Sequence, residues 1–195
     1  MRICLYGGTF DPPHNGHLAI AEQCLKNLNI DRAIFIPAFL APHKTNVKIS
    51  SAKDRLAMLR LAIQPYPGLE ISELEIDRKG ISYSIDTIIQ IKKALSLNSE
   101  NLYFLIGADS LAELHTWRQP ERILDESRVV VAGRPHYSMD DVPVDYRNRV
   151  EILSNPLMDI SSTDIRQKVE RHESVRHLIP ESVAGYINIH KLYRT

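Results

Sequence analysis

The chain alternates between short runs of consecutive apolar residues and longer segments in which apolar residues recur every three or four positions. The apolar runs predict buried strands, and most stop at a glycine or a proline: Ile3–Tyr6, Ala33–Ile36, Leu102–Ile106 and Val129–Ala132. Weaker strand patterns occupy Leu69–Ile71, Leu74–Ile76 and Ile152–Leu153. The helical spacing predicts helices over residues 15–29, 51–64, 84–95, 162–171 and 181–189.

This order of elements predicts the fold class. Strands that are apolar throughout and alternate with helices are typical of a parallel sheet covered on both faces. We therefore expect an α/β fold: a Rossmann-like open parallel sheet with helices on both faces and a C-terminal helical appendage from about residue 160. Residues 1–195 would form one domain, with ligands at the carboxyl ends of the strands. The polar segments 37–50 and 134–149 are expected to be surface loops.

The charge balance narrows the range of partners. Lysine plus arginine and aspartate plus glutamate both total 24, so the net charge is zero and a nucleic-acid polymer is not an expected partner. No run approaches the ~20 apolar residues of a membrane span. The N-terminus has no charged and then apolar leader, so the expected location is the cytoplasm. Cys4 and Cys24 are expected to be buried hydrophobic residues rather than part of a disulfide or a metal site.

The densest chemical pattern lies in the run Gly7–His17. Its glycines follow a predicted strand and precede a predicted helix, an arrangement in which backbone N–H groups approach an anion closely. The run lacks both the Gly-x-Gly-x-x-Gly fingerprint of dinucleotide binding and the Gly-Lys-Ser/Thr of a P-loop. Instead, His14 and His17 stand at the helix start, where imidazoles suit phosphate oxygens. Local capping and a His-x-x-His metal pair are the alternatives, with Asp11 as the one further metal ligand nearby.

Later stretches offer charged and hydroxyl groups that would complement this phosphate site. Lys44, in a polar loop, is by default a solvated lysine, but near a phosphate it supplies a cation for the transferring group. Ser82–Thr87 by default caps a helix, and its hydroxyls also suit a second phosphate. Asp109 follows the strand that ends at Gly107 and is either a helix cap or a carboxylate for ribose hydroxyls.

Two further features bear on an aromatic substrate and on a polyphosphate. Trp117 is the only tryptophan. Such a residue is more often part of the core, but its polar flanks predict a partly exposed ring that can stack on an aromatic substrate. The hydroxyls of Ser161, Ser162 and Thr163 precede a helix, and three in a row exceed what one cap needs. Together with Arg166 in the first turn, they predict a cradle for a polyphosphate.

The opening run also matches a known signature. The pattern Thr/Ser-Phe-Asp-Pro-x-His-x-Gly-His of the nucleotidyltransferase superfamily is present at every position from Thr9 to His17. Further stretches are similar to those of the bacterial nicotinate-nucleotide adenylyltransferases: Pro42–Lys44, Tyr83–Thr87, Gly107–Trp117 and Ile160–Arg166. The resemblance thus extends from Gly7 to Arg166. Departures from many relatives lie beside the pyridine site, at Phe39, Leu40, Ala41, Ser84 and Arg118.

The resemblance implies a role for each matching residue. The catalytic contacts to the ATP phosphates would come from His14, His17, Lys44 and Arg166. ATP binding would also involve Gly7, Gly8, Thr9, Phe10, Gly107, Asp109, Ser161 and Ser162. The pyridine mononucleotide would be held by Tyr83, Ser84, Trp117 and Arg134. No protein side chains are expected to form a dedicated metal site, because Mg²⁺ would be bound mainly through ATP.

The implied reaction is transfer of AMP from ATP to nicotinate mononucleotide, which gives deamido-NAD and pyrophosphate in NAD biosynthesis. A pantetheine-phosphate adenylyltransferase is the close alternative, because it shares the opening signature. A cytidylyltransferase and a non-catalytic nucleotide-binding regulator are weaker alternatives, and a dinucleotide-dependent oxidoreductase is disfavoured by the missing glycine fingerprint. The sequence leaves open the preference between nicotinate and nicotinamide mononucleotide and whether the chain forms a homo-oligomer.

Overall fold

The structure is a computed structural model, and it describes residues 1–42, 49–133, 142, 144–156 and 158–194. Its strands are β1 (Ile3–Gly8), β2 (Arg32–Pro37), β3 (Leu69–Ile71), β4 (Leu102–Gly107), β5 (Arg128–Ala132) and β6 (Val150–Leu153). Its α-helices are α1 (Asn15–Asn27), α2 (Ala52–Ile63), α3 (Leu74–Arg78), α4 (Ser84–Ala94), α5 (Ala108–Ala112), α6 (Pro120–Glu126), α7 (Val144–Arg147), α8 (Ser162–Glu170) and α9 (Glu181–Ile189). Among the described residues, η2 (Ser99–Asn101) and η3 (Leu114–Thr116) are short 3₁₀ helices.

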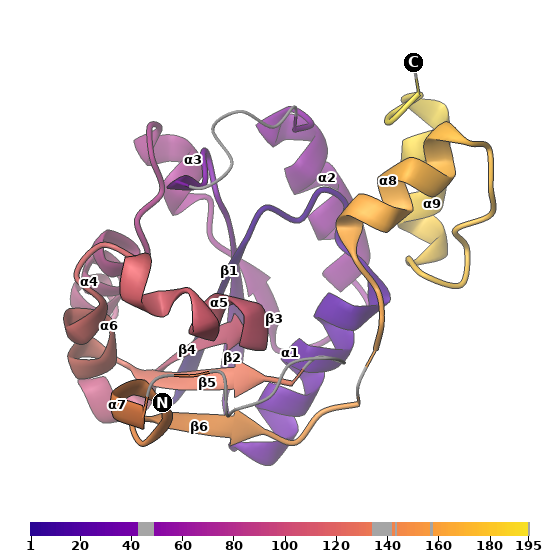
Figure 1. The fold of residues 1–195 in the computed structure, drawn as a ribbon. Helices are drawn as coiled ribbons and strands as arrows, with labels where there is room; N and C mark the ends of the chain where they lie inside the picture. The colour runs from indigo at the N-terminus through magenta and orange to yellow at the C-terminus, as the bar shows by residue number, and fades with distance from the viewer. Residues whose placement is uncertain (43–48, 134–141, 143, 157, 195) are drawn as a thin grey trace.

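The six strands of the described residues form one sheet in the order β3-β2-β1-β4-β5-β6, and every neighbouring pair is parallel (Figure 1). The chain winds outward from β1 toward β3 and then returns to the centre to build β4, β5 and β6 on the other side. The winding therefore reverses between β1 and β4, and in open α/β sheets a crevice for ligands lies outside the carboxyl ends of the strands at this point. The predicted fold class is confirmed.

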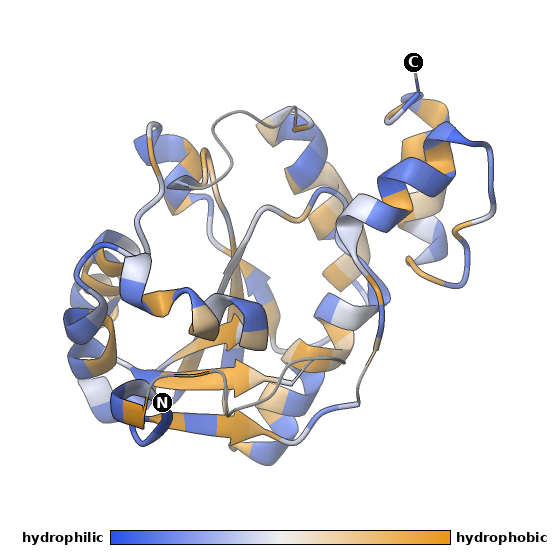
Figure 2. Ribbon diagram, in the orientation of Figure 1, coloured by the Kyte–Doolittle hydropathy of each residue, from blue (hydrophilic) through white to orange (hydrophobic). Residues whose placement is uncertain are grey.

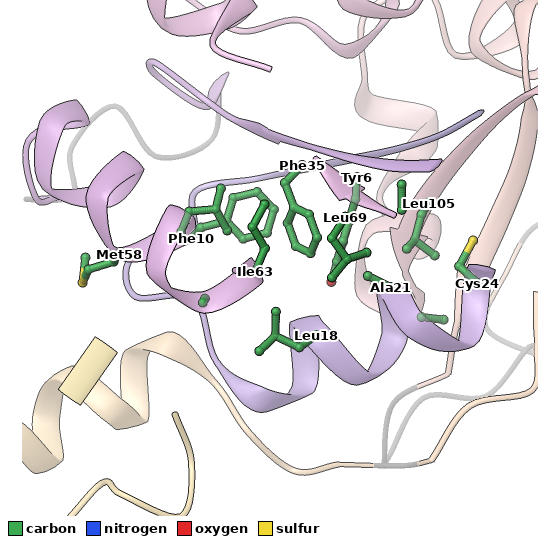
Figure 3. Packing of buried hydrophobic residues seen from close by; sticks show 14 of the residues in the cluster. Tyr6, Phe10, Leu18, Ala21, Cys24, Phe35, Met58, Ile63, Leu69 and Leu105 are labelled. Carbon is green, nitrogen blue, oxygen red and sulfur yellow. The ribbon is translucent and has the colours of Figure 1, made fainter. Parts of the chain in front are cut away.

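Alternate residues of each central strand contribute to two separate hydrophobic clusters, one on each face of the sheet. On one face, Tyr6 and Phe35 pack with residues of α1 and α2, including Leu18 and Met58 (Figure 3). On the other face, the intervening strand residues pack with α4, α5 and α6. Figure 2 shows the resulting pattern, in which the central strands are hydrophobic and the helices alternate between hydrophobic and hydrophilic surfaces. Helices thus cover both faces, as the apolar strands predict.

The C-terminal helices extend the cluster that contains α1 and α2. Ile165 of α8 and Val183 of α9 are fully buried in that cluster. Helix α9 lies against α2, and the Tyr186 hydroxyl donates a hydrogen bond to Asp54 of α2 (3.0 Å). The C-terminal helical appendage is therefore confirmed (Figure 1). Its packing brings the end of the chain close to the turn that follows β1.

The structure corrects the predicted strand at Leu74–Ile76, because these residues belong to helix α3. The apolar pattern was too short to separate a strand from a single helical turn. In the fold, Glu75 is buried and accepts a hydrogen bond from Thr87 of α4 (2.5 Å). This contact joins α3 to a residue twelve positions further along the chain.

Other differences concern short elements. Helix α6 begins with Pro120 in its first turn, a favoured position for proline, and was not predicted. Helix α7 lies within the segment 134–149, which was predicted to be a loop. Strand β6 begins at Val150, two residues before the predicted strand. Cys4 and Cys24 are buried and free, as predicted, with their sulfur atoms 3.3 Å apart. Among the described residues, no helix is long and apolar enough to cross a membrane.

Candidate active site

A cavity of about 770 Å³ opens at the carboxyl ends of β1 and β4, where the winding of the sheet reverses. This volume is in the range of sites for nucleotide-sized ligands. Every predicted site residue that the structure describes contributes to its wall: Gly7, Gly8, Thr9, Phe10, His14, His17, Tyr83, Ser84, Gly107, Asp109, Trp117, Ser161, Ser162 and Arg166. Lys44 and Arg134 lie outside the described residues. The roles of all these residues remain predictions.

The turn between β1 and α1 is shaped by a close contact between Gly8 and Phe10. Phe10 has a left-handed backbone (φ 52°), which turns its ring back over Gly8. A Cβ atom at Gly8 would lie 2.8 Å from the ring, so a larger residue there would displace it. Phe10 is buried, and its ring meets the edge of Phe35 and of His17. The turn is thereby anchored to the core directly beside the histidines.

His14 and His17 begin helix α1 by capping each other. His14 is the N-cap residue, and its Nδ1 accepts the backbone N–H of His17 (3.4 Å), while the Nδ1 of His17 accepts the backbone N–H of His14 (3.2 Å). The two rings stack with their centroids 3.6 Å apart. A neutral imidazole that accepts through Nδ1 carries its hydrogen on Nε2. Both rings therefore carry an N–H donor, which is the polarity that a phosphate oxygen requires; that of His14 is buried, and the His17 ring is partly exposed.

Gly16 is needed for this stack. A Cβ atom at position 16 would lie only 3.1 Å from the Nδ1 atom of His14. The His14 side chain is almost fully buried and has little room to move. The spacing His-x-Gly-His therefore follows from the geometry: the two histidines sit one helical turn apart, and the glycine between them leaves space for the first ring.

The second wall is the N-terminus of α8. Ser161 is the N-cap residue and accepts the backbone N–H of Asp164 (3.0 Å). Ser162 donates from its hydroxyl to the Pro12 carbonyl (2.9 Å), which joins α8 to the turn after β1. Arg166 donates to the Asp11 carbonyl (2.8 Å) and reaches the same cavity. The first turns of α1 and α8 thus face one space, and both helix dipoles favour an anion there.

Sequence reasoning missed a buried arginine beneath the site. Arg55 of α2 is only 1% exposed, and it donates to the backbone carbonyls of Thr9 (2.8 Å), Ala38 (2.7 Å) and Ser50 (3.3 Å). Burial lowers the pKa of Arg55, and the negative charge of Asp11 opposes this shift. One signal was available: Arg55 is in phase with apolar residues of the same helix, so it stands on the buried face.

The opposite end of the cavity is lined by aromatic side chains. Trp117 is partly buried and meets the edge of the Phe104 ring, with a centroid distance of 6.3 Å. Tyr83 is the residue before α4, and the guanidinium of Arg118 lies 4.7 Å from the centre of its ring. Arg118 also pairs with Asp86 at 3.4 Å. These contacts make an open aromatic wall of the kind that an aromatic ligand can stack on.

Asp109 also lines the cavity, in the first turn of α5, which begins directly after β4. Its carboxylate folds back toward Gly107, since a Cβ atom there would lie 2.3 Å from the Oδ1 atom. Glu75 also reaches the cavity, although it was not predicted as a site residue. Its partner Thr87 belongs to α4, so this hydrogen bond joins α3 to the helix that begins at Ser84.

Comparison with known proteins agrees with this geometry. The family described as cytidylyltransferase-like matches residues 5–168. Two curated proteins named "Probable nicotinate-nucleotide adenylyltransferase" are similar over nearly their full lengths. The Roseiflexus sp. (strain RS-1) protein is 42% identical, with 98% of each chain covered, and the Exiguobacterium sibiricum protein is 43% identical, with 100% of each covered.

A solved structure shares the fold. Plasmodium falciparum nicotinic acid mononucleotide adenylyltransferase, complexed with NaAD, superposes with a TM-score of 0.81 at 19% identity, covering 98% of this chain and 97% of that one. By its fold, its signature turn and the family match, the chain is a cytidylyltransferase-like nucleotidyltransferase. Within that class, its curated relatives place it in the nicotinate-nucleotide adenylyltransferase family.

Proposed function

We propose that the protein transfers the adenylyl group of ATP to nicotinate mononucleotide, giving deamido-NAD and pyrophosphate. The observation that carries this proposal is the continuity of one cavity, which joins the paired histidines and the α8 N-terminus to the aromatic wall around Trp117. One end offers donors for a triphosphate, and the other offers a flat surface for a pyridine ring. The relatives' names and the NaAD complex of the Plasmodium enzyme agree with both halves.

The chemistry needs no covalent intermediate on the protein. An oxygen of the acceptor's 5′-phosphate attacks the α-phosphorus of ATP, a new P–O bond forms, and the bond to the β-phosphate oxygen breaks to release pyrophosphate. The attacking phosphate is already ionised at neutral pH, so no strong general base is required. The protein contributes alignment of the two substrates and donors for the charge that develops on the phosphates.

Within this scheme the donors have distinct sources. The Nε2–H groups of His14 and His17 would bind phosphate oxygens from the α1 side, and Arg166 with the first turn of α8 would bind them from the other. Lys44 stays in the proposal as a further cation for the triphosphate. Asp109 would accept hydrogen bonds from the adenosine ribose.

Mg²⁺ would enter with ATP, as part of the substrate. Its preferred ligands are oxygens, and the phosphates supply most of them. The described residues contain no group of three or more His, Cys, Asp or Glu side chains placed to hold a metal ion. A magnesium complex of ATP therefore fits a cavity whose phosphate end is lined by donors. We also place the reaction in the cytoplasm, a setting that suits the free thiols of Cys4 and Cys24.

The experiment is a pyrophosphate-release assay with ATP, Mg²⁺ and one acceptor at a time. The acceptors are nicotinate mononucleotide, nicotinamide mononucleotide and phosphopantetheine. We expect turnover with nicotinate mononucleotide to exceed turnover with the other two. Activity with phosphopantetheine and with neither pyridine mononucleotide would overturn the proposal in favour of the alternative that shares the signature. Absence of pyrophosphate with all three acceptors, from protein that binds ATP, would instead indicate a non-catalytic nucleotide-binding protein.

A further inference from the structure

The end of the chain reaches into the signature turn. The Tyr193 hydroxyl donates to the Oδ1 atom of Asp11 at 2.6 Å, across 182 positions of sequence. Asp11 is only 1% exposed, and its other carboxylate oxygen accepts the backbone N–H of Ser50 at 2.9 Å. Both oxygens of this buried carboxylate are thus held by donors from distant parts of the chain.

Asp11 is itself a junction of the phosphate site. Its backbone carbonyl accepts the hydrogen bond from Arg166, and the neighbouring carbonyl of Pro12 accepts the one from Ser162. Two residues further on, His14 caps α1. Asp11 therefore links Tyr193, which binds its carboxylate, to the residues of the phosphate site, Arg166 and His14.

The phenol is well suited to this contact. Burial, followed by the charge of Asp11 and the hydrogen bond to it, raises the pKa of Tyr193 well above its ordinary value. Tyr193 consequently remains protonated and can act as the donor at any physiological pH. Its backbone has φ 61°, a left-handed conformation that is uncommon outside glycine. The side chain packs against the core cluster that contains Met58, and the hydroxyl oxygen lies 3.8 Å from the Met58 sulfur.

We infer that Tyr193 is a positioning residue for adenylyl transfer: through Asp11 it fixes the turn that presents His14 and His17 to the phosphates. This inference rests on the proposed function for its catalytic readout. If the Tyr193 hydroxyl is lost, the buried carboxylate keeps one donor, the Ser50 N–H, and the turn after β1 can change its position. Displacements of about 1 Å at residues remote from the reacting atoms can cost up to roughly a hundredfold in rate.

The same C-terminal unit supplies a matched control. Tyr186 of α9 also donates its hydroxyl to a carboxylate, that of Asp54 on α2, at 3.0 Å. This contact holds the appendage to the body of the protein but does not touch the turn after β1. Tyr186→Phe and Tyr193→Phe therefore remove chemically equivalent hydrogen bonds from the same unit, and they differ in which element loses its support.

The experiment compares both variants with the native protein in steady-state turnover and in thermal melting. We expect both variants to lose melting temperature, and Tyr193→Phe to lose more, because Asp11 is buried whereas Asp54 is partly exposed to water. Only Tyr193→Phe should lose kcat, by on the order of tenfold or more. Its KM for the pyridine mononucleotide should change less than twofold, since the described side-chain contacts of Trp117, Tyr83 and Arg118 are made with residues other than Asp11. Equal kcat in the two variants would show that Tyr193 only stabilises the fold and would overturn the inference.

A second variant tests the same path from the acceptor side. Asp11→Asn keeps the side-chain volume but leaves one oxygen acceptor for two donors, the Tyr193 hydroxyl and the Ser50 N–H, because an NH₂ group replaces the other oxygen. It should lower kcat by itself, and adding Tyr193→Phe to it should change kcat by less than twofold, because the two residues act as one unit. Independent, multiplicative effects would contradict the inference. If Tyr193→Phe does not fold, Asp11→Asn alone decides: a kcat within twofold of native would overturn the inference, because Tyr193 is inferred to act through Asp11.

The binding of ATP separates failure of the inference from failure of the proposed function. ATP with Mg²⁺ is titrated into each protein in a calorimeter, with no acceptor present. If no acceptor supports turnover in the native protein, the proposed function fails, and the inference is judged on ATP affinity alone. It then requires weaker ATP binding in Tyr193→Phe than in Tyr186→Phe, and equal affinities would overturn it.

Discussion

The two ends of the cavity are built in different ways. At the phosphate end, each group is tied to backbone atoms: the histidines cap each other, Ser162 and Arg166 bind carbonyls, and Arg55 binds three more. At the aromatic end, the side-chain contacts of Trp117, Tyr83 and Arg118 join one side chain to another, and those of Arg118 are near solvent. The first end is preorganised for one kind of group, whereas the second can adjust to the acceptor.

This contrast has a chemical reason. A triphosphate is the same in every turnover of every related enzyme, and the charge that develops in the transition state needs donors that are already in place. An acceptor ring needs a surface with which to stack, and such a surface tolerates small shifts. Variants at the phosphate end should therefore affect stability or kcat strongly, and variants at the aromatic end should act more weakly and mainly on KM for the acceptor.

The largest effect is expected for Arg55→Met. Methionine fills much of the same volume but leaves the carbonyls of Thr9, Ala38 and Ser50 without this donor, and it leaves the charge of Asp11 without this partner. Removing one partner of a buried charged network costs about 3–5 kcal/mol. Urea unfolding should show a loss of this size. A loss below about 1 kcal/mol would mean that the hydrogen bonds of Arg55 do not stabilise the phosphate end.

His17→Ala should be the next largest, and its effect should appear in turnover. Loss of one preorganised donor to the transferring phosphate is expected to cost about 10²–10³ in kcat. Stability should fall by only about 1 kcal/mol, the typical contribution of a helix cap. Pyrophosphate release and thermal melting on the same preparation measure both quantities. Turnover within a factor of two of native would remove His17 from the proposed mechanism.

Trp117→Ala should have an intermediate effect that is confined to the acceptor. Stacking of a base on an aromatic side chain is worth about 1–3 kcal/mol, so KM for nicotinate mononucleotide should rise by roughly 5- to 150-fold. KM for ATP should stay within twofold of native. Trp117→Phe is the matched control, because it keeps an aromatic face and should recover most of the affinity. A rise in both KM values would argue against two separate ends.

Arg118→Ala is expected to have the smallest effect. Its ion pair with Asp86 joins two partly exposed side chains, and its contact with Tyr83 is near the surface. Each contributes at most about 1 kcal/mol. We expect an unfolding free energy within about 1 kcal/mol of native and a rise of less than about tenfold in KM for the acceptor. A larger rise, with no change in kcat, would make Arg118 a direct contact to the acceptor.

The sequence predicts the local structure of the site well where residues close together in the chain form one structural element. The turn from Gly7 to His17 is such a case, because glycines and histidines at fixed spacing specify a strand, a turn and a helix start together. Trp117 is another, since its polar flanks predict the partial exposure that the structure shows. The strand order follows less directly, but long apolar runs between helices already imply parallel pairing.

The residues that the sequence did not reveal are buried polar groups whose partners lie far away. Arg55 and Thr9 are 46 positions apart, and Tyr193 and Asp11 are 182 positions apart. No local pattern identifies the partners of such a pair: the helical phase of Arg55 indicates burial but not the carbonyls that it binds, and Tyr193 alone resembles an ordinary C-terminal tyrosine. The error at Leu74–Ile76 has a different origin, since three residues are too few for the apolar pattern to separate a strand from a helical turn.

The mutual cap of His14 and His17 couples the start of helix α1 to the protonation state of the two rings. Each ring can accept a backbone N–H only while its Nδ1 atom keeps a lone pair, and an imidazolium has none to offer. Adding a proton to either ring therefore removes a cap from the first turn of α1. The beginning of that helix and the phosphate site therefore depend on the same two atoms, the Nδ1 atoms of His14 and His17.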